Sequence, residues 1–98
     1  MKYLVLVTVK PTAQIDPAML LSHKDWGLQQ VAKGVMESLY TFAGTGNGMC
    51  ILTADTPEQL DDIIASAPAF FYCDLDVRPL ADFAAQMDRI ANGLKRLG

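Results

Sequence analysis

The chain has 98 residues, of which 51% are hydrophobic and only 19% charged, and its formal net charge is −3. This length suits one domain with a single modest core, which association with further copies would help to stabilise. The largest basic cluster is the pair Lys95 and Arg96, which argues against a nucleic-acid partner. Apolar runs of about five residues are far shorter than the roughly 20 that span a bilayer, which argues against a membrane protein.

The N-terminus and the cysteines both bear on the compartment in which the protein is expected. One lysine is followed by strand-like alternation at the N-terminus, which is not the pattern of a signal peptide. Cys50 and Cys73 both fall in predicted strands, as in a reduced protein and unlike a disulfide scaffold. We therefore expect a cytoplasmic protein.

The first predicted strand covers residues 2–10, which are β-branched and apolar enough for a central strand covered on both faces. Pro11 ends it. A helix then opens with Asp16 as the N-cap and Pro17 in the first helical position, and Gly34 stops it. The predicted apolar stripe of this helix consists of Leu21, Leu28, Val31 and Ala32.

A hairpin and a second helix come next. Residues 35–43 and 49–54 are predicted strands, and the glycine-rich segment 44–48 joins them as a turn. A capping box from Thr56 to Gln59 starts the second helix. Its predicted apolar stripe consists of Leu60, Ile63, Ile64 and Ala67.

The fourth predicted strand covers residues 72–78, where Cys73, Leu75 and Val77 alternate with polar residues. The order of elements is that of two βαβ halves in a ferredoxin-like α+β sandwich, βαββαβ. Two helices cover one face of such a sheet and leave the other bare. Because strands this apolar cannot leave that face in water, we expect a second subunit to pack against it, as in a dimeric α+β barrel.

The last segment, residues 81–98, is predicted to form an extra C-terminal helix. Its apolar residues recur at steps of three and four: Phe83, Met87, Ile90 and Leu94. We therefore divide the chain into a barrel domain, residues 1–80, and a C-terminal helix, residues 81–98, which must dock on its own domain or on a neighbour.

His23 is the only histidine of the chain, and Trp26 follows it one helical turn later. In a pocket between helix and sheet, His23 could act as a general base, because its ordinary pKa suits proton transfer near neutrality. The alternative is a partly exposed helical residue without a role in chemistry.

Further candidates lie on the predicted strands. Glu37 and Tyr40 are three residues apart on one strand, which predicts that they point to opposite faces. Tyr72 begins the fourth strand beside Phe70. A carboxylate or phenol in an apolar pocket can have its pKa shifted enough to carry protons. The alternatives are a solvated edge glutamate and tyrosines that pack in a core or an interface.

Two common kinds of site find no support in the sequence. The glycine-rich segment 44–48 is followed by a strand, whereas a phosphate-binding loop precedes a helix, so turn geometry accounts for its glycines. One histidine and two distant cysteines give no metal-ligand spacing. No Ser-His-Asp or Cys-His set can be assembled from so few candidates.

From about residue 34 to residue 80, the sequence resembles the muconolactone isomerase family. The shared features are Gly34, the aromatic Tyr40, Gly44 near the turn, the helix entry at 56–60 and the ending at 68–80. The resemblance implies a ferredoxin-like dimeric barrel that can assemble further into a decamer. It also implies an enzyme without a cofactor that shifts a ring double bond in a small unsaturated lactone during the breakdown of aromatic compounds.

If the protein transfers protons, we expect His23 to be the base and Glu37 and Tyr40 to be the other catalytic candidates. The residues expected to shape the substrate pocket are Trp26, Phe70 and Tyr72. We further expect one cavity to be bordered by His23, Trp26, Tyr40 and Tyr72.

The sequence departs from the family at informative points. Phe71 stands where the family has a proline, and Thr41 stands where it has a basic residue that would pair with an anionic lactone. His23 gives a weaker similarity to the YCII-related family. The alternatives are a small-molecule-binding protein or a cofactor-independent oxygenase of the same superfamily, and an oligomerising domain without catalysis.

Overall fold

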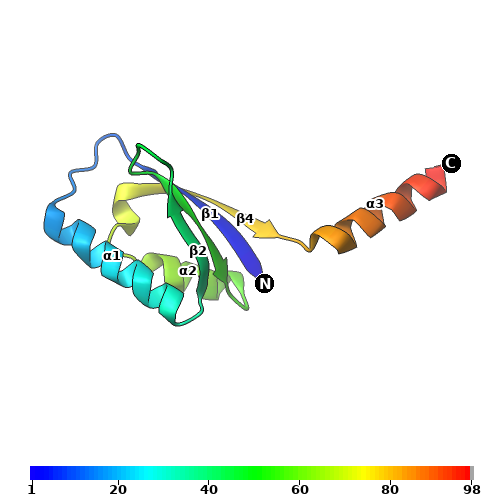
Figure 1. Ribbon diagram of the computed structural model, residues 1–98, viewed down its shortest axis with the longest axis horizontal. Coiled ribbons are helices and arrows are strands. Elements are labelled where there is room, and N and C mark those ends of the chain that lie inside the picture. The colour runs from blue at the N-terminus through cyan, green and yellow to red at the C-terminus, as the bar shows by residue number, and fades with distance from the viewer. Residues whose placement is uncertain (98) are drawn as a thin grey trace.

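The computed structural model describes residues 1–97 and confirms the predicted order of elements. Two βαβ halves are followed by a separate helix (Figure 1). The elements are β1 (Lys2–Val9), α1 (Pro17–Ala32), β2 (Met36–Thr41), β3 (Gly48–Thr53), α2 (Pro57–Ala65), the short 3-10 helix η1 (Phe70–Tyr72), β4 (Cys73–Leu80) and α3 (Phe83–Leu97). Strand β2 is shorter than predicted, β3 is shifted by one residue, Tyr72 belongs to η1, and the predicted end of the last helix at Gly98 lies outside the described residues.

The helix caps form as their sequence signals predict. The Asp16 carboxylate accepts a hydrogen bond from the Met19 N–H at 2.7 Å, and the Thr56 hydroxyl accepts one from the Gln59 N–H at 3.1 Å. The side chain of Gln59 reaches back to the N–H of Asp55, one residue before the expected partner in a capping box. Each cap satisfies backbone donors that the first turn leaves without partners.

The sheet is antiparallel throughout, in the order β2-β3-β1-β4. This is the strand order of the ferredoxin-like sandwich, in which the first strand lies between the third and the fourth. Helices α1 and α2 both cover the same face (Figure 1). The core on this face is centred on Val5 and Leu52, the most deeply buried large side chains.

The other face of the sheet carries no helix, and we call it the open face. Alternation along the strands turns the partly exposed side chains of Leu4, Leu6, Met49 and Ile51 toward it. These four residues form the centre of the open face, because Leu4 pairs with Ile51 and Leu6 with Met49. Charged side chains surround them, including an ion pair of Arg78 with Asp76 at 2.8 Å.

A β-bulge between Met36 and Ser38 corrects one sequence prediction. Glu37 and Tyr40 were expected on opposite faces, but the extra residue of the bulge places both on the open face. Tyr40 pairs with Met49 of that face, and Glu37 forms an ion pair with Lys2 at 2.7 Å. Strict alternation between these two positions therefore gives the wrong result.

The buried face of α1 is also different from the prediction. Leu21 and Leu28, which belong to the predicted apolar stripe, are 57% and 58% exposed. The face that meets the sheet instead contains Gly27 and Gln30, which are buried, and Trp26, which packs against the core. The leucines of α1 thus form a second apolar surface that the single chain leaves uncovered.

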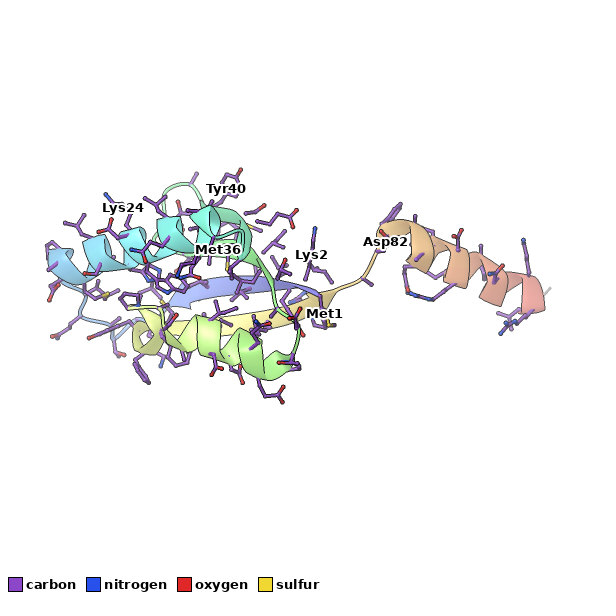
Figure 2. All side chains as sticks on the ribbon, turned by 90° about the horizontal axis from the view of Figure 1, so that it is seen from below. Met1, Lys2, Lys24, Met36, Tyr40 and Asp82 are labelled. Atoms are coloured by element: carbon purple, nitrogen blue, oxygen red, sulfur yellow. The ribbon has the colours of Figure 1, made fainter. Side chains whose placement is uncertain are left out.

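Helix α3 stands apart from the sheet and the other helices in both views (Figures 1 and 2). The molecule is accordingly elongated, with extents of 59 × 28 × 23 Å. The described residues of α3 include none that is buried, and Phe83 of its apolar stripe is 76% exposed. The helix begins with a hydrogen bond from the Ala85 N–H to the Asp82 carboxylate at 2.9 Å.

Replacing Leu52 by Ala should lower the free energy of unfolding by about 2–5 kcal/mol, because it leaves a cavity in the most buried part of the core. Urea denaturation followed by circular dichroism measures this change. Leu97→Ala is the matched control, since Leu97 is 85% exposed and should change stability by less than about 0.5 kcal/mol. Equal losses in the two variants would show that Leu52 is not at the centre of the core.

Candidate functional site

A small apolar cavity of about 70 Å³ lies between the helices and the sheet. Its walls come from β1, α1, β2, β3, α2 and the segment that leads into β4. No charged side chain is among its lining residues in the part of the chain described: Val5, Val7, His23, Trp26, Met36, Leu39, Cys50, Leu52, Ile64, Ala67, Ala69, Phe70, Cys73 and Leu75. The cavity can hold only an apolar part of a ligand.

Both cysteines line this apolar cavity, and both are unpaired thiols. Burial raises the pKa of the Cys50 thiol to about 11. Burial also raises the pKa of the Cys73 thiol, and the negative charge of Asp74 adds to this effect. Because a thiol reacts as its thiolate, these pKa shifts make both cysteines poor nucleophiles near neutrality.

A larger groove of about 480 Å³ lies between α1 and the β2–β3 hairpin. Its polar lining comes from His23 and Lys24 of α1 and from Tyr40 and Thr41 of β2. Figure 2 labels Lys24 and Tyr40. Among residues 1–97, no Asp or Glu lines it, although the chain has 11 of them. Of the residues that the structure describes, Lys24 alone places a charge on this wall, so the groove favours a negatively charged ligand.

The groove and the cavity meet at a common wall. The four residues that line both are Val7, His23, Trp26 and Leu39. A ligand in the groove therefore has an apolar cavity beside it and a cationic side chain, Lys24, from α1. Such a combination of an apolar wall and a few polar groups is typical of sites for small molecules.

The position of α1 against β2 depends on Gly27. A Cβ atom added at Gly27 would lie 2.9 Å from Cδ2 of Leu39, closer than real Cβ contacts. The absence of a side chain thus allows the helix to come near the sheet at this point. His23 and Trp26, on the preceding turn of the helix, are brought to the common wall as a result.

His23 is fixed in place by two contacts. Its ring stacks on that of Trp26, with 5.6 Å between the centroids and an angle of 20° between the planes. Its Nδ1 accepts a hydrogen bond from the Ala69 N–H at 3.4 Å. Burial of the imidazole lowers the pKa of His23 below its ordinary value of 6.5, so the ring is neutral near pH 7.

Trp26 is held from the other side by α2. Its indole N–H donates to the Ser66 hydroxyl at 2.9 Å, and that hydroxyl donates to the Ile63 carbonyl at 2.6 Å. The stacked pair of rings is therefore tied to two points on the segment that leads from α2 to β4, Ser66 and Ala69. A side chain held by packing and hydrogen bonds loses less entropy when a ligand binds.

The structure brings some of the predicted site residues together and separates others. His23, Trp26 and Tyr40 line the groove, and Phe70 lines the adjoining cavity. Tyr72 lines neither, so the prediction that it borders the same hollow as His23 is wrong. It lies in η1, which turns the chain before β4 begins, whereas the sequence suggested that the strand starts there.

Glu37 also lies away from both hollows, because the bulge turns it to the open face, where it pairs with Lys2. Lys24 was not singled out from the sequence, although it lines the groove. The available signal was its helical spacing: Leu20, Lys24 and Leu28 recur every four residues and all line the groove. The predicted leucine stripe obscured this pattern.

No helix among residues 1–97 is long and apolar enough to cross a membrane. The same residues contain no group of three or more His, Cys, Asp or Glu side chains placed to hold a metal ion.

Comparison with known proteins agrees with the geometry of the fold. The family model of muconolactone delta-isomerase matches residues 1–86. The chain belongs to the muconolactone delta-isomerase family. Its fold is similar to that of a crystal structure of muconolactone isomerase, with a TM-score of 0.72 and 26% sequence identity over 84% of this chain and 90% of the other.

A second solved structure shares the fold at lower identity. It is the 5-chloro-2-hydroxyhydroquinone dehydrochlorinase of Burkholderia phenoliruptrix AC1100, in complex with 2,5-dihydroxybenzoquinone. The TM-score is 0.55 with 14% identity, over 87% of this chain and 98% of that one. The search of curated proteins finds no match.

Titration of His23 should give a pKa below 6.5 in the folded protein. The charged and titratable side chains that line the groove with it are Lys24 and Tyr40, and neither favours an imidazolium as a carboxylate would. As pH falls, the unfolded chain takes up this proton at a higher pH than the folded chain does. The stability due to the neutral ring is therefore fully present above pH 6.5. It is lost as pH falls from 6.5 through the lower pKa of the folded state. Proton NMR of the single histidine measures the pKa, with the urea-unfolded chain as the reference; a pKa at or above the unfolded value would contradict the burial seen here.

Proposed function

We propose that this protein is an isomerase without a cofactor that shifts a double bond in a small lactone or cyclic acid. Membership of the muconolactone delta-isomerase family supports the class of reaction. The observation that carries the proposal is the groove itself. Among the described residues, its wall has one cation and no carboxylate, and an apolar cavity lies beside it. A ring with an attached carboxylate matches both parts of this site.

Lys24 supplies the charge that would bind such a carboxylate. Thr41, on the opposite element of the groove, has a hydroxyl where the family resemblance implies a basic residue, so the positive charge here comes from α1 instead of β2. The Thr41 hydroxyl can still donate a hydrogen bond to the same group. A charge-assisted hydrogen bond from an ammonium to a carboxylate is about twice as strong as one between neutral groups.

The proposed reaction moves one proton and changes no oxidation state. A proton leaves the ring carbon at the far end of the unsaturated carbonyl system, the electron pair moves onto the carbonyl oxygen as a dienolate, and the proton returns to the carbon next to the carbonyl. Such a reaction needs a group that carries the proton and a donor that stabilises the dienolate oxygen. His23 is the groove's candidate for these tasks. Tyr40 also lines the groove, although alternation along β2 turns its side chain, like that of Glu37, toward the open face.

Lys24→Met should raise the KM for muconolactone about tenfold and change kcat little, because the ammonium would bind substrate and transition state alike. Steady-state kinetics with muconolactone, followed by the change in its absorbance, gives both constants. Lys33→Met is the matched control, since Lys33 caps the end of α1 and lines neither hollow. Absence of turnover in the wild type, or equal KM values in the two variants, would count against this proposal.

We also propose that the working form is a homo-oligomer, at least a dimer, with the open face as an interface. Leu4, Leu6, Met49 and Ile51 give this face an apolar centre, and the ion pairs of Lys2 and Arg78 lie around it. An apolar centre with a polar rim is the usual composition of an interface between identical subunits. A decamer remains a prediction from the family resemblance.

Ile51→Arg should convert the oligomer to smaller species, because a buried charge without a partner costs several kcal/mol at an interface. Light scattering at micromolar concentration measures the mass, and the wild type should be at least dimeric. Asp61→Arg is the control, since Asp61 is an exposed residue of α2, on the other side of the sheet. A wild-type monomer, or an Ile51→Arg variant that keeps its full mass, would rule out the open face as the interface.

A further inference from the structure

The hydrogen bond at His23 determines where the proton of the neutral imidazole lies. The Ala69 N–H is a donor, so His23 Nδ1 must be the acceptor and cannot carry a proton. In a neutral imidazole the single ring proton then lies on Nε2. A nitrogen that carries a proton has no lone pair available to take another, so in this tautomer Nε2 is a donor.

Two contacts oppose a turn of the ring that would exchange its two nitrogens, and a third contact holds Trp26 in place. The Trp26 ring stacks on one face of the imidazole, and Trp26 is itself bonded to Ser66 at 2.9 Å. If the ring turned away, the Ala69 N–H would lose its hydrogen-bond partner. Because Ala69 is only 5% exposed, water does not easily replace that partner. The cost of an unsatisfied buried N–H, about 1–3 kcal/mol, favours the Nδ1-acceptor state.

Nε2 faces outward from this anchor. In the part of the chain that the structure describes, every buried side-chain nitrogen or oxygen has a hydrogen-bond partner. Nε2 has no protein partner there, so it is not among the buried atoms. Nε2 is therefore accessible, and the accessible surface of His23 is the wall that the groove and the cavity share. The ring stays neutral near pH 7, because burial disfavours the imidazolium, Lys24 is a second cation in the groove, and no carboxylate of residues 1–97 lines it.

We propose that His23 acts as a hydrogen-bond donor, whose Nε2–H binds the ligand oxygen on which negative charge develops, and that it is not the general base. A neutral, fixed donor in an apolar site stabilises such an oxygen without having to reorganise during the reaction. Neutral imidazoles act in this way in other isomerases. The identity of the oxygen, a dienolate, rests on the proposed function, whereas the tautomer rests on the Ala69 contact alone. The proton is then carried by a group other than His23.

Nitrogen NMR of the uniformly ¹⁵N-labelled protein at pH 8 tests the tautomer without any substrate. Correlations from the two carbon-bound ring protons identify each nitrogen of the single histidine. The expected spectrum has an unprotonated Nδ1 and a protonated Nε2. A proton on Nδ1, or averaged signals from two tautomers in exchange, would overturn the proposal.

The variants His23→Gln and His23→Ala separate a donor from a base. The side-chain amide of Gln places an N–H near the position of Nε2 but is not basic, whereas Ala removes both properties. With muconolactone as substrate, the Gln variant should keep kcat within about tenfold of the wild type, and the Ala variant should lose about 10²–10³-fold. Equal large losses would mean that His23 is the base and would overturn the proposal.

Two controls keep these outcomes distinct. Thermal unfolding of both variants shows whether a loss of kcat comes from misfolding, and only variants that keep the wild-type melting temperature are compared. A wild type that does not turn over muconolactone would count against the proposed function. The NMR measurement needs no substrate, so it would still decide the tautomer and hence whether Nε2 is a donor.

Discussion

The close contact between α1 and β2 at Gly27 and Leu39 is the constraint on which the rest of the site depends. A Cβ added at Gly27 would lie 2.9 Å from Cδ2 of Leu39, so a larger residue fits there only if the leucine side chain shifts. This contact lies at the groove, which both residues line. It also brings His23 and Trp26 to the wall that groove and cavity share. Side chains from the segment after α2 then fix the two rings.

The features that were predictable from the sequence are those that short-range chemistry determines. Asp16 and Thr56 cap their helices because a side-chain oxygen three residues before a free N–H has the right reach. The strand order follows from the pattern of two βαβ halves, and the sheet has that order. The common position of His23, Trp26 and Tyr40 could also be anticipated, because a helix and a neighbouring strand of this fold face one another.

The failures have long-range causes. α1 is apolar on several sides, so its sequence does not show which side meets the sheet; the close contact at Gly27 decides it, and the leucines are left outside. A single extra residue at the bulge places Glu37 on the open face. A prediction from the regular alternation of side chains along a strand cannot detect such a residue. The role of Ala69 as a backbone donor to His23 leaves no trace in residue type, because every residue except proline has that N–H.

The chain has a single tryptophan, and it is the one that stacks on His23 and lines both hollows. Its fluorescence therefore comes from one known place, the wall of the site. Protonation of the neighbouring imidazole, or a ring placed against the indole, changes the surroundings of this one chromophore. The protein thus contains an optical reporter of its own groove, which can register the arrival of a ligand whether or not that ligand is then converted.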